Sequence, residues 1–339
     1  MRRFLKVAAL VAPLAAIACS SSTEPGTHTE QANTKRVPHD SVAHPAAAGN
    51  ATTRVLGLGG RPFGLTVTAS GDVLVTEQDL NQAVHSDSLG GEPATLASGR
   101  DPGDVVATRG GTAFVSGYFD GTITMVNLSN NTVTQTVQVS SSNAYRVVLS
   151  KDESQLFVTS NDGHLYTMNT STRAVTGSIP LSASQGLTQG LTLNHAGTRL
   201  YASSTSGAIS RLDLPGLTTG RSTSLLNCAA QDVALATDDS ELYVACEGGR
   251  VMVLHPVTLA VKDSVSLSGA APFGLAVSPD NAQLYVASAL TGSLTIIDRA
   301  TRSVIRTLTL GGMPRRVAFN RFGNKAYVSN EQNWIDIIE

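Results

Sequence analysis

Charged and amide side chains recur along the chain at intervals of 40 to 44 residues, each just ahead of a short apolar run. Polar groups that converge beside aromatic ones describe a ligand site. A second interpretation is that Asp104 pairs with Arg146 and Asp232 with Arg316, so that the charges only satisfy one another. The sequence leaves both interpretations open. The candidate ligand-binding residues are Asp104, Tyr145, Arg146, Gln189, Gln231, Asp232, Arg315 and Arg316.

A repeat of about 42 residues must position these side chains, and its best-formed copy is Ala271–Gly312. Runs rich in Val, Ile, Leu and Thr, separated by turn residues, predict four strands in that copy. Four strands in a period of this length are typical of a β-propeller blade. We expect an all-β, seven-bladed β-propeller of four-stranded antiparallel blades. The strands expected in the best copy are Leu275–Ser278, Leu284–Ser288, Ser293–Ile297 and Val304–Leu310, and the seven copies start at Arg61, Asp101, Asn143, Leu187, Ala229, Ala271 and Met313.

The last copy lacks its fourth strand, because the chain stops at Glu339. The segment Arg54–Gly60 aligns with the fourth strand of the preceding copy, Arg306–Gly312. We therefore expect the N-terminal strand to complete the last blade and close the ring, which removes an open sheet edge.

The phrase Pro272–Asp280, followed by Leu284–Ser288 and Ile296–Asp298, resembles the YVTN-type repeat of YncE-like seven-bladed propellers. The resemblance covers residues 52–339. It implies an exported, envelope-associated binding or scaffolding propeller. Related propellers include lactonase-like and streptogramin-lyase-like enzymes, and an enzyme of either kind is the alternative function.

The N-terminal segment predicts export. Met1–Ala18 has the basic start and short apolar run of a signal peptide, and Cys19 follows in a sequence that resembles a bacterial lipobox. The alternative is an ordinary secretory signal cleaved nearby. Residues 19–51 are rich in Ser, Thr, Pro and Ala and are expected to form a disordered tether to the propeller at 52–339. We expect a chain anchored by lipid to the bacterial cell envelope, with no other contact to the membrane.

Two cysteines flank the first two strands of the fifth copy. Cys228 precedes the inner strand and Cys246 ends the next, so hairpin geometry can bring them to bonding distance. An exported protein can form the bond. We expect a structural disulfide, and the alternative is two unpaired thiols.

Other classes of function find less support. With residues 1–18 removed the net charge is −5, so a nucleic-acid partner is not expected. The histidines at 85, 164, 195 and 255 fall at different strand positions, so they are not expected to converge on one metal ion. We therefore expect no metal site, and we expect no cofactor. No residue is assigned a catalytic role. We expect a monomer whose partner, of unknown identity, is a protein, peptide, glycan or small ligand.

Overall fold

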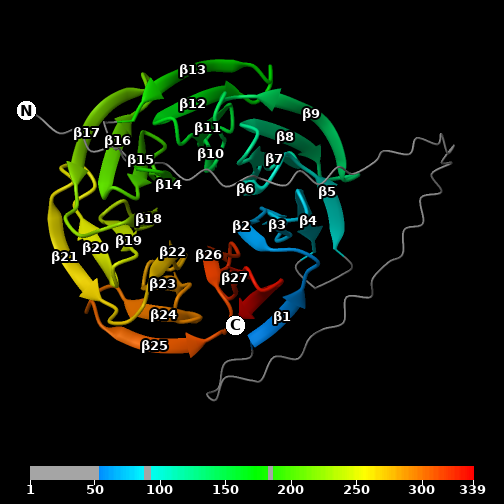
Figure 1. Ribbon diagram of the computed structural model, residues 1–339. Helices are drawn as coiled ribbons and strands as arrows, with labels where there is room; N and C mark the ends of the chain where they lie inside the picture. The colour runs from blue at the N-terminus through cyan, green and yellow to red at the C-terminus, as the bar shows by residue number, and fades with distance from the viewer. Residues whose placement is uncertain (1–52, 88–92, 182–185) are drawn as a thin grey trace, which may run out of the picture. The chain divides into compact units, whose positions relative to one another are not determined.

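The computed structural model describes residues 53–87, 93–181 and 186–339. These residues form seven four-stranded antiparallel sheets arranged as the blades of a ring (Figure 1). The predicted seven-bladed propeller is therefore confirmed. The signal peptide, Cys19 and the tether lie outside the described residues. Within the described ranges, no helix is long and apolar enough to cross a membrane.

The seven inner strands surround the central channel, and each begins a blade. Six of them are six residues long, whereas the third is cut to three. The inner strands are β2 (Pro62–Val67), β6 (Pro102–Ala107), β10 (Val147–Leu149), β14 (Thr188–Leu193), β18 (Ala230–Leu235), β22 (Pro272–Val277) and β26 (Pro314–Phe319).

The second and third strands of each blade are mostly buried, because the sheets cover one another face to face. The second strands are β3 (Val73–Glu77), β7 (Thr112–Gly117), β11 (Gln155–Thr159), β15 (Arg199–Ser204), β19 (Leu242–Cys246), β23 (Gln283–Ser288) and β27 (Ala326–Asn330). The third strands are β4 (Gln82–Ser86), β8 (Thr122–Asn127), β12 (His164–Asn169), β16 (Ala208–Asp213), β20 (Arg250–Leu254), β24 (Ser293–Asp298) and β28 (Trp334–Ile338).

The outermost strands are largely exposed, and their polar Thr and Ser residues suit the rim of the ring. They are β5 (Ala94–Ala97), β9 (Thr132–Gln138), β13 (Val175–Pro180), β17 (Thr218–Ser224), β21 (Val261–Ser266), β25 (Val304–Thr309) and, in the last blade, β1 (Thr53–Gly57).

The last blade is assembled from both ends of the chain. Strand β1 pairs antiparallel with β28, and its register runs from Thr53 opposite Ile338 to Gly57 opposite Trp334. This is the pairing that the alignment of Arg54–Gly60 with Arg306–Gly312 predicts.

The inner strands begin earlier than the sequence predicts. Strand β22 starts at Pro272 rather than Leu275, and its pairing with β23 shifts register between Pro272 and Gly274. A β-bulge of this kind bends the strand and re-aims the side chains around it. The same shift occurs at the start of five other inner strands, so the candidate site residues on those strands lie in or beside bulges.

A polar residue that ends the third strand closes the next turn in the second and sixth blades. Asn127 Oδ1 accepts a hydrogen bond from the Ser129 amide at 2.9 Å, and Asp298 Oδ1 accepts one from the Thr301 amide at 2.8 Å.

The ring has two faces, which we name after an exposed phenylalanine on each. The Phe119 face carries the loops that lead into the inner strands and the turns between second and third strands. The Phe322 face carries the turns between first and second strands and those between third and fourth strands. Because Thr53 lies opposite Ile338, the chain joins the ring on the Phe322 face.

Candidate functional site

Four charged side chains from four inner-strand positions meet around the channel, and we call them the channel belt: Asp104, Arg146, Asp232 and Arg316. Arg146 Nη1 lies 3.0 Å from Asp104 Oδ1, and Arg146 Nη2 lies 3.8 Å from Asp232 Oδ1. Arg316 Nη1 lies 2.9 Å from Asp232 Oδ2. The structure therefore brings both predicted pairs together and joins them through an Arg146–Asp232 contact that the sequence did not predict.

Backbone geometry explains why the belt is compact. The corresponding position is Gly64, Gly190 or Gly274 in the other three blades. A Cβ added to Gly64 would lie 2.6 Å from Asp104 Cα, and one added to Gly190 would lie 2.9 Å from Asp232 Cα. Glycine lets the neighbouring inner strands approach, and this draws the charged residues toward one another.

Three of the four belt residues are almost fully buried. Asp104, Asp232 and Arg316 are 3%, 4% and 2% exposed, whereas the Arg146 side chain is 15% exposed. Burial raises the pKa of the Asp104 carboxyl, although Arg146 and the Val147 amide oppose this effect. Burial alone would lower the pKa of Arg316, but the nearby Asp232 raises it above its usual value. Two carboxylates and two guanidiniums thus hold one another in a region with little solvent.

Aromatic rings pack against the belt on the side of the Phe119 face. Phe63, Tyr145 and Phe273 form a buried cluster, with the Phe63 ring 6.0 Å from that of Tyr145 and 5.7 Å from that of Phe273. The Arg316 guanidinium lies over Phe273 at 5.1 Å, and that of Arg315 lies over the same ring at 4.3 Å. Contacts of this kind are favourable, and more so when desolvated.

The other candidate polar residues contact either the belt or a neighbouring glutamate. The backbone carbonyl of Gln189 accepts a hydrogen bond from Nη2 of the belt residue Arg316 at 3.3 Å. Arg315 Nε donates to Glu331 at 2.8 Å, and Gln231 Nε2 donates to Glu247 at 2.7 Å. Sequence reasoning missed both glutamates, although each directly follows the second strand of its blade and that shared position was a usable signal.

A cavity of about 370 Å³ lies in the channel beside the belt. All four belt residues line it, and the lining continues along the inner strands to His195 and Thr237. Those two residues lie in turns of the Phe322 face. The cavity therefore reaches the Phe322 face, which is opposite the loops that lead into the inner strands.

The Phe119 face carries large exposed apolar side chains from five blades. Phe119 is 61% exposed, Leu290 is 77% exposed and Leu226 is 87% exposed. Beside Phe119, Tyr118 packs edge-on against Tyr145 at 5.3 Å, so the exposed ring lies next to the aromatic cluster. The apolar residues exposed in the loops and turns of this face are Leu80, Phe119, Leu187, Leu226 and Leu290.

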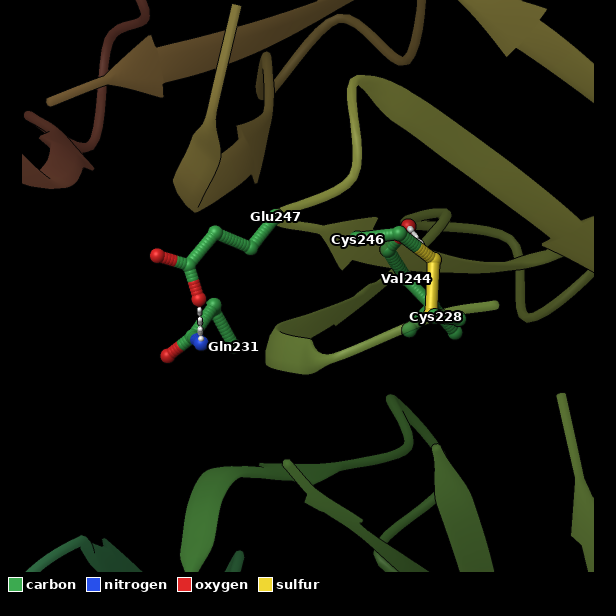
Figure 2. The surroundings of a disulfide bond; sticks show 5 residues. All are labelled: Cys228, Gln231, Val244, Cys246 and Glu247. Atoms are coloured by element: carbon green, nitrogen blue, oxygen red, sulfur yellow. Dashed lines mark hydrogen bonds between the residues drawn. A yellow bond between two sulfur atoms is a disulfide. The ribbon is translucent and has the colours of Figure 1, made fainter. Parts of the chain in front are cut away.

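A disulfide joins Cys228 to Cys246 in the fifth blade, at the pair that the sequence predicts (Figure 2). Cys246 ends β19 and lies opposite Ala230, the first residue of β18. The next residue of each strand end, Gln231 after Ala230 and Glu247 after Cys246, forms the hydrogen bond described above (Figure 2). The disulfide therefore fastens the start of the strand that carries Asp232.

The described residues hold no group of three or more His, Cys, Asp or Glu side chains placed to bind a metal ion.

Comparison with known proteins identifies the fold and no family. No family model matches the chain, and no curated protein matches it. Hydrazine synthase of Kuenenia stuttgartiensis is similar in structure, with a TM-score of 0.75 at 15% identity over 83% of this chain and 96% of that one.

Two further solved structures are similar to the same extent. The Cps50 (Swd1) β-propeller domain of Myceliophteria thermophila has a TM-score of 0.72 at 13% identity, over 84% of this chain and 98% of that one. A chain of a Mitotic Checkpoint Complex has a TM-score of 0.76 at 14% identity, over 94% of this chain and 98% of its own. At these identities the likeness shows that the chain has a β-propeller fold, and this fold hosts many functions.

Proposed function

We propose that this chain is an envelope-anchored binding or scaffolding propeller that holds a partner protein on its Phe119 face. The observation that carries the proposal is the set of exposed apolar side chains on that face, above all Phe119, Leu226 and Leu290. Exposed apolar groups rimmed by polar ones mark sites of protein association. Aromatic anchors near the centre of such a surface contribute most of the binding energy.

The proposed anchor leaves this face accessible. The chain joins the ring at Thr53, on the Phe322 face. A lipid on Cys19, linked through residues 19–51, would therefore attach to the ring on the side away from the proposed binding surface. One of the similar structures is a chain of a multiprotein complex, which is compatible with a scaffolding role.

Photo-crosslinking from each face tests the proposal. The photoreactive residue p-benzoylphenylalanine replaces Phe119 in one variant and Phe322 in the other, each in the full-length chain in its native envelope. The two sites are matched, since both are exposed phenylalanines, at 61% and 74%. We expect a discrete cross-linked protein from position 119 and none from position 322.

Two results would count against the proposed surface: equal products from both positions, or no product from position 119. A discrete product should also weaken when Leu226→Ala is added, because this residue lies on the same face. Adding Val304→Ala, on the exposed outer strand β25, should leave it unchanged.

A further inference from the structure

A second hollow lies on the Phe119 face, between the fifth and sixth blades, and we call it the Arg250 pocket. Its volume of about 520 Å³ is within the range of ligand sites, about 300–1,000 Å³. It lies where the turn after β19, the end of β21 and the loop into β22 meet the turn after β23. Its lining includes Arg250, Ser264, Ser266, Ser268 and Leu290.

The charge in the lining of the Arg250 pocket is a single exposed cation. Arg250 is the one charged residue there, and no carboxylate among the described residues forms an ion pair with it. By contrast, Arg315 on the same face is paired with Glu331 at 2.8 Å. The carboxylate of the nearby Glu247 accepts the Gln231 hydrogen bond at 2.7 Å (Figure 2). The pocket therefore has a positive charge that the chain itself does not neutralise.

The backbone of Arg250 is fixed by the strands on both sides. In β20 it lies opposite Cys246 of β19, which the disulfide joins to Cys228. On its other side it lies opposite Ser266 of β21. A group that is already held in place loses less conformational entropy when it binds a partner.

Exposed apolar side chains accompany the Arg250 pocket. Leu290 is in its lining and is 77% exposed. A Cβ added to Gly248 would lie 3.3 Å from the carbonyl oxygen of Asn227, so the loop that carries the exposed Leu226 lies against the turn of the pocket. Apolar contacts beside a charge that sets orientation are typical of a protein interface.

We propose that the partner protein inserts an acidic side chain into the Arg250 pocket, an inference that rests on the proposed function of the Phe119 face. The carboxylate of the partner accepts charge-assisted hydrogen bonds from the Arg250 guanidinium, whose planar donors match its geometry. The exposed serines of the lining supply further donors. An apolar side chain beside that acid in the partner packs on Leu290. The surface thus recognises an acidic residue next to an apolar one.

Charge reversal tests the pocket in the chain that carries p-benzoylphenylalanine at position 119. Arg250→Glu should lower the yield of the cross-linked partner about tenfold or more, because repulsion replaces a charge-assisted hydrogen bond. The matched control is Arg221→Glu, since Arg221 is also exposed and without an ion pair among the described residues but lies on the outer strand β17. The control should give the yield of the parent chain.

The outcomes separate this inference from the proposed function. A product at position 119 that Arg250→Glu leaves intact, or that both reversals weaken equally, would overturn the acidic contact while the binding face stands. A parent chain that gives no product at position 119 would overturn both.

A second variant keeps the cation and fills the space. Ser268→Trp places a bulky ring at an exposed turn position in the lining of the Arg250 pocket. It should lower the yield as Arg250→Glu does. An unchanged yield would show that the partner does not enter the pocket.

The chemistry of the partner can be identified from the cross-linked product. With p-benzoylphenylalanine in place of Leu290, mass spectrometry should find a partner peptide with an Asp or Glu close to the attachment point. Replacing that acid by lysine in the partner should restore the yield in the Arg250→Glu variant. A cross-linked lipid or glycan, or a peptide without an acidic residue, would overturn the proposal.

Discussion

The protein contains two networks of carboxylates and guanidiniums, and they differ in how fully their members are bonded. The channel belt lies between inner strands. The second network, which we call the Glu241 cluster, joins the fifth and sixth blades and consists of Glu241, Tyr243, Lys262, Arg299 and Arg302.

The Glu241 cluster has its hydrogen-bonding groups occupied. Lys262 Nζ donates to Glu241 at 2.7 Å, Arg302 and the Tyr243 hydroxyl also donate to this carboxylate, and Arg299 Nε donates to the Tyr243 hydroxyl at 2.7 Å. Burial alone would raise the pKa of Glu241, but hydrogen bonds from Arg302, Lys262 and Tyr243 lower it from 4.5 to about 2. Three cations are thus committed to one carboxylate.

This difference in hydrogen bonding indicates that the Glu241 cluster contributes more to stability than the channel belt does. The Glu241 carboxylate accepts hydrogen bonds from residues of both blades and so fastens them together. The channel belt keeps buried donors and an acceptor without hydrogen-bond partners among the described residues, and it lines a cavity. Buried polar groups are normally paired, so the unpaired groups of the belt contribute less to stability than those of the Glu241 cluster.

The largest effect is expected when the belt loses one guanidinium. Arg316→Met leaves Asp232 with Arg146 at 3.8 Å as its remaining cation in the belt. Removing one partner of a buried pair costs about 3–5 kcal/mol because a buried charge is left uncompensated. Urea unfolding at pH 7 should show a loss of this size.

The double variant Asp232→Asn with Arg316→Met separates charge from packing. It removes both members of the pair, so much of the lost stability should return. A double variant as unstable as the sum of the two single variants would mean that packing, and not charge, accounts for the loss.

The two networks also differ in how far the sequence could predict them. Asp104, Arg146, Asp232 and Arg316 occupy one aligned position of the repeat, so their meeting around the channel followed from the period. Glu241, Lys262 and Arg302 occupy turn and rim positions with no shared register, and only the packing of two blades brings them together. The disulfide was predictable because a hairpin brings Cys228 and Cys246 to one sheet edge.

The location of the cavity was not predictable either, because it also depends on how neighbouring blades pack. The three aromatic residues Phe63, Tyr145 and Phe273 share the aligned position just before the belt, so the repeat does place their rings around the axis. The face that the cavity reaches depends instead on the bulges at the strand starts and on side-chain volumes from several blades, which the spacing of the repeats does not encode.

The disulfide lies in the fifth blade, which contributes Asp232 to the channel belt and Tyr243 to the Glu241 cluster. Cys228 and Cys246 are 18 residues apart, and a cross-link over a loop of this size contributes about 3 kcal/mol. The double variant Cys228→Ser with Cys246→Ser should unfold at a correspondingly lower urea concentration. Hydrogen exchange should increase more at Asp232 than at Tyr243, and equal increases would show that the disulfide does not support the belt selectively.

Asp336 is a third case beside the two networks, because its buried carboxyl has two neutral hydrogen-bond donors and no cation as partners within the described part of the chain. Trp334 Nε1 donates to it at 3.0 Å and Asn330 Nδ2 at 3.3 Å. Burial raises its pKa from 3.8 to about 6 in spite of these two bonds. The folded chain favours the protonated form, so stability is retained below pH 3.8 and is lost as the pH rises through about 6.

Asp336→Asn should therefore stabilise the chain by about 2 kcal/mol at pH 8, because the amide accepts the same bonds without a buried charge. At pH 4 the variant and the wild type should be nearly equal. The free energy of unfolding measured at both values checks this, and a variant that is less stable at pH 8 would contradict the assignment.

The smallest effect is expected at Glu241, and its sign is opposite. The depressed pKa means that the stabilising contribution is fully present above pH 4.5 and is lost as the pH falls toward 2. Glu241→Gln should cost about 1–2 kcal/mol at pH 7, a value reduced for solvent screening because its partners Lys262 and Arg302 are partly exposed, and almost nothing at pH 2. An equal loss of stability at pH 7 and pH 2 would show that packing, and not the charge of Glu241, accounts for the effect of the substitution.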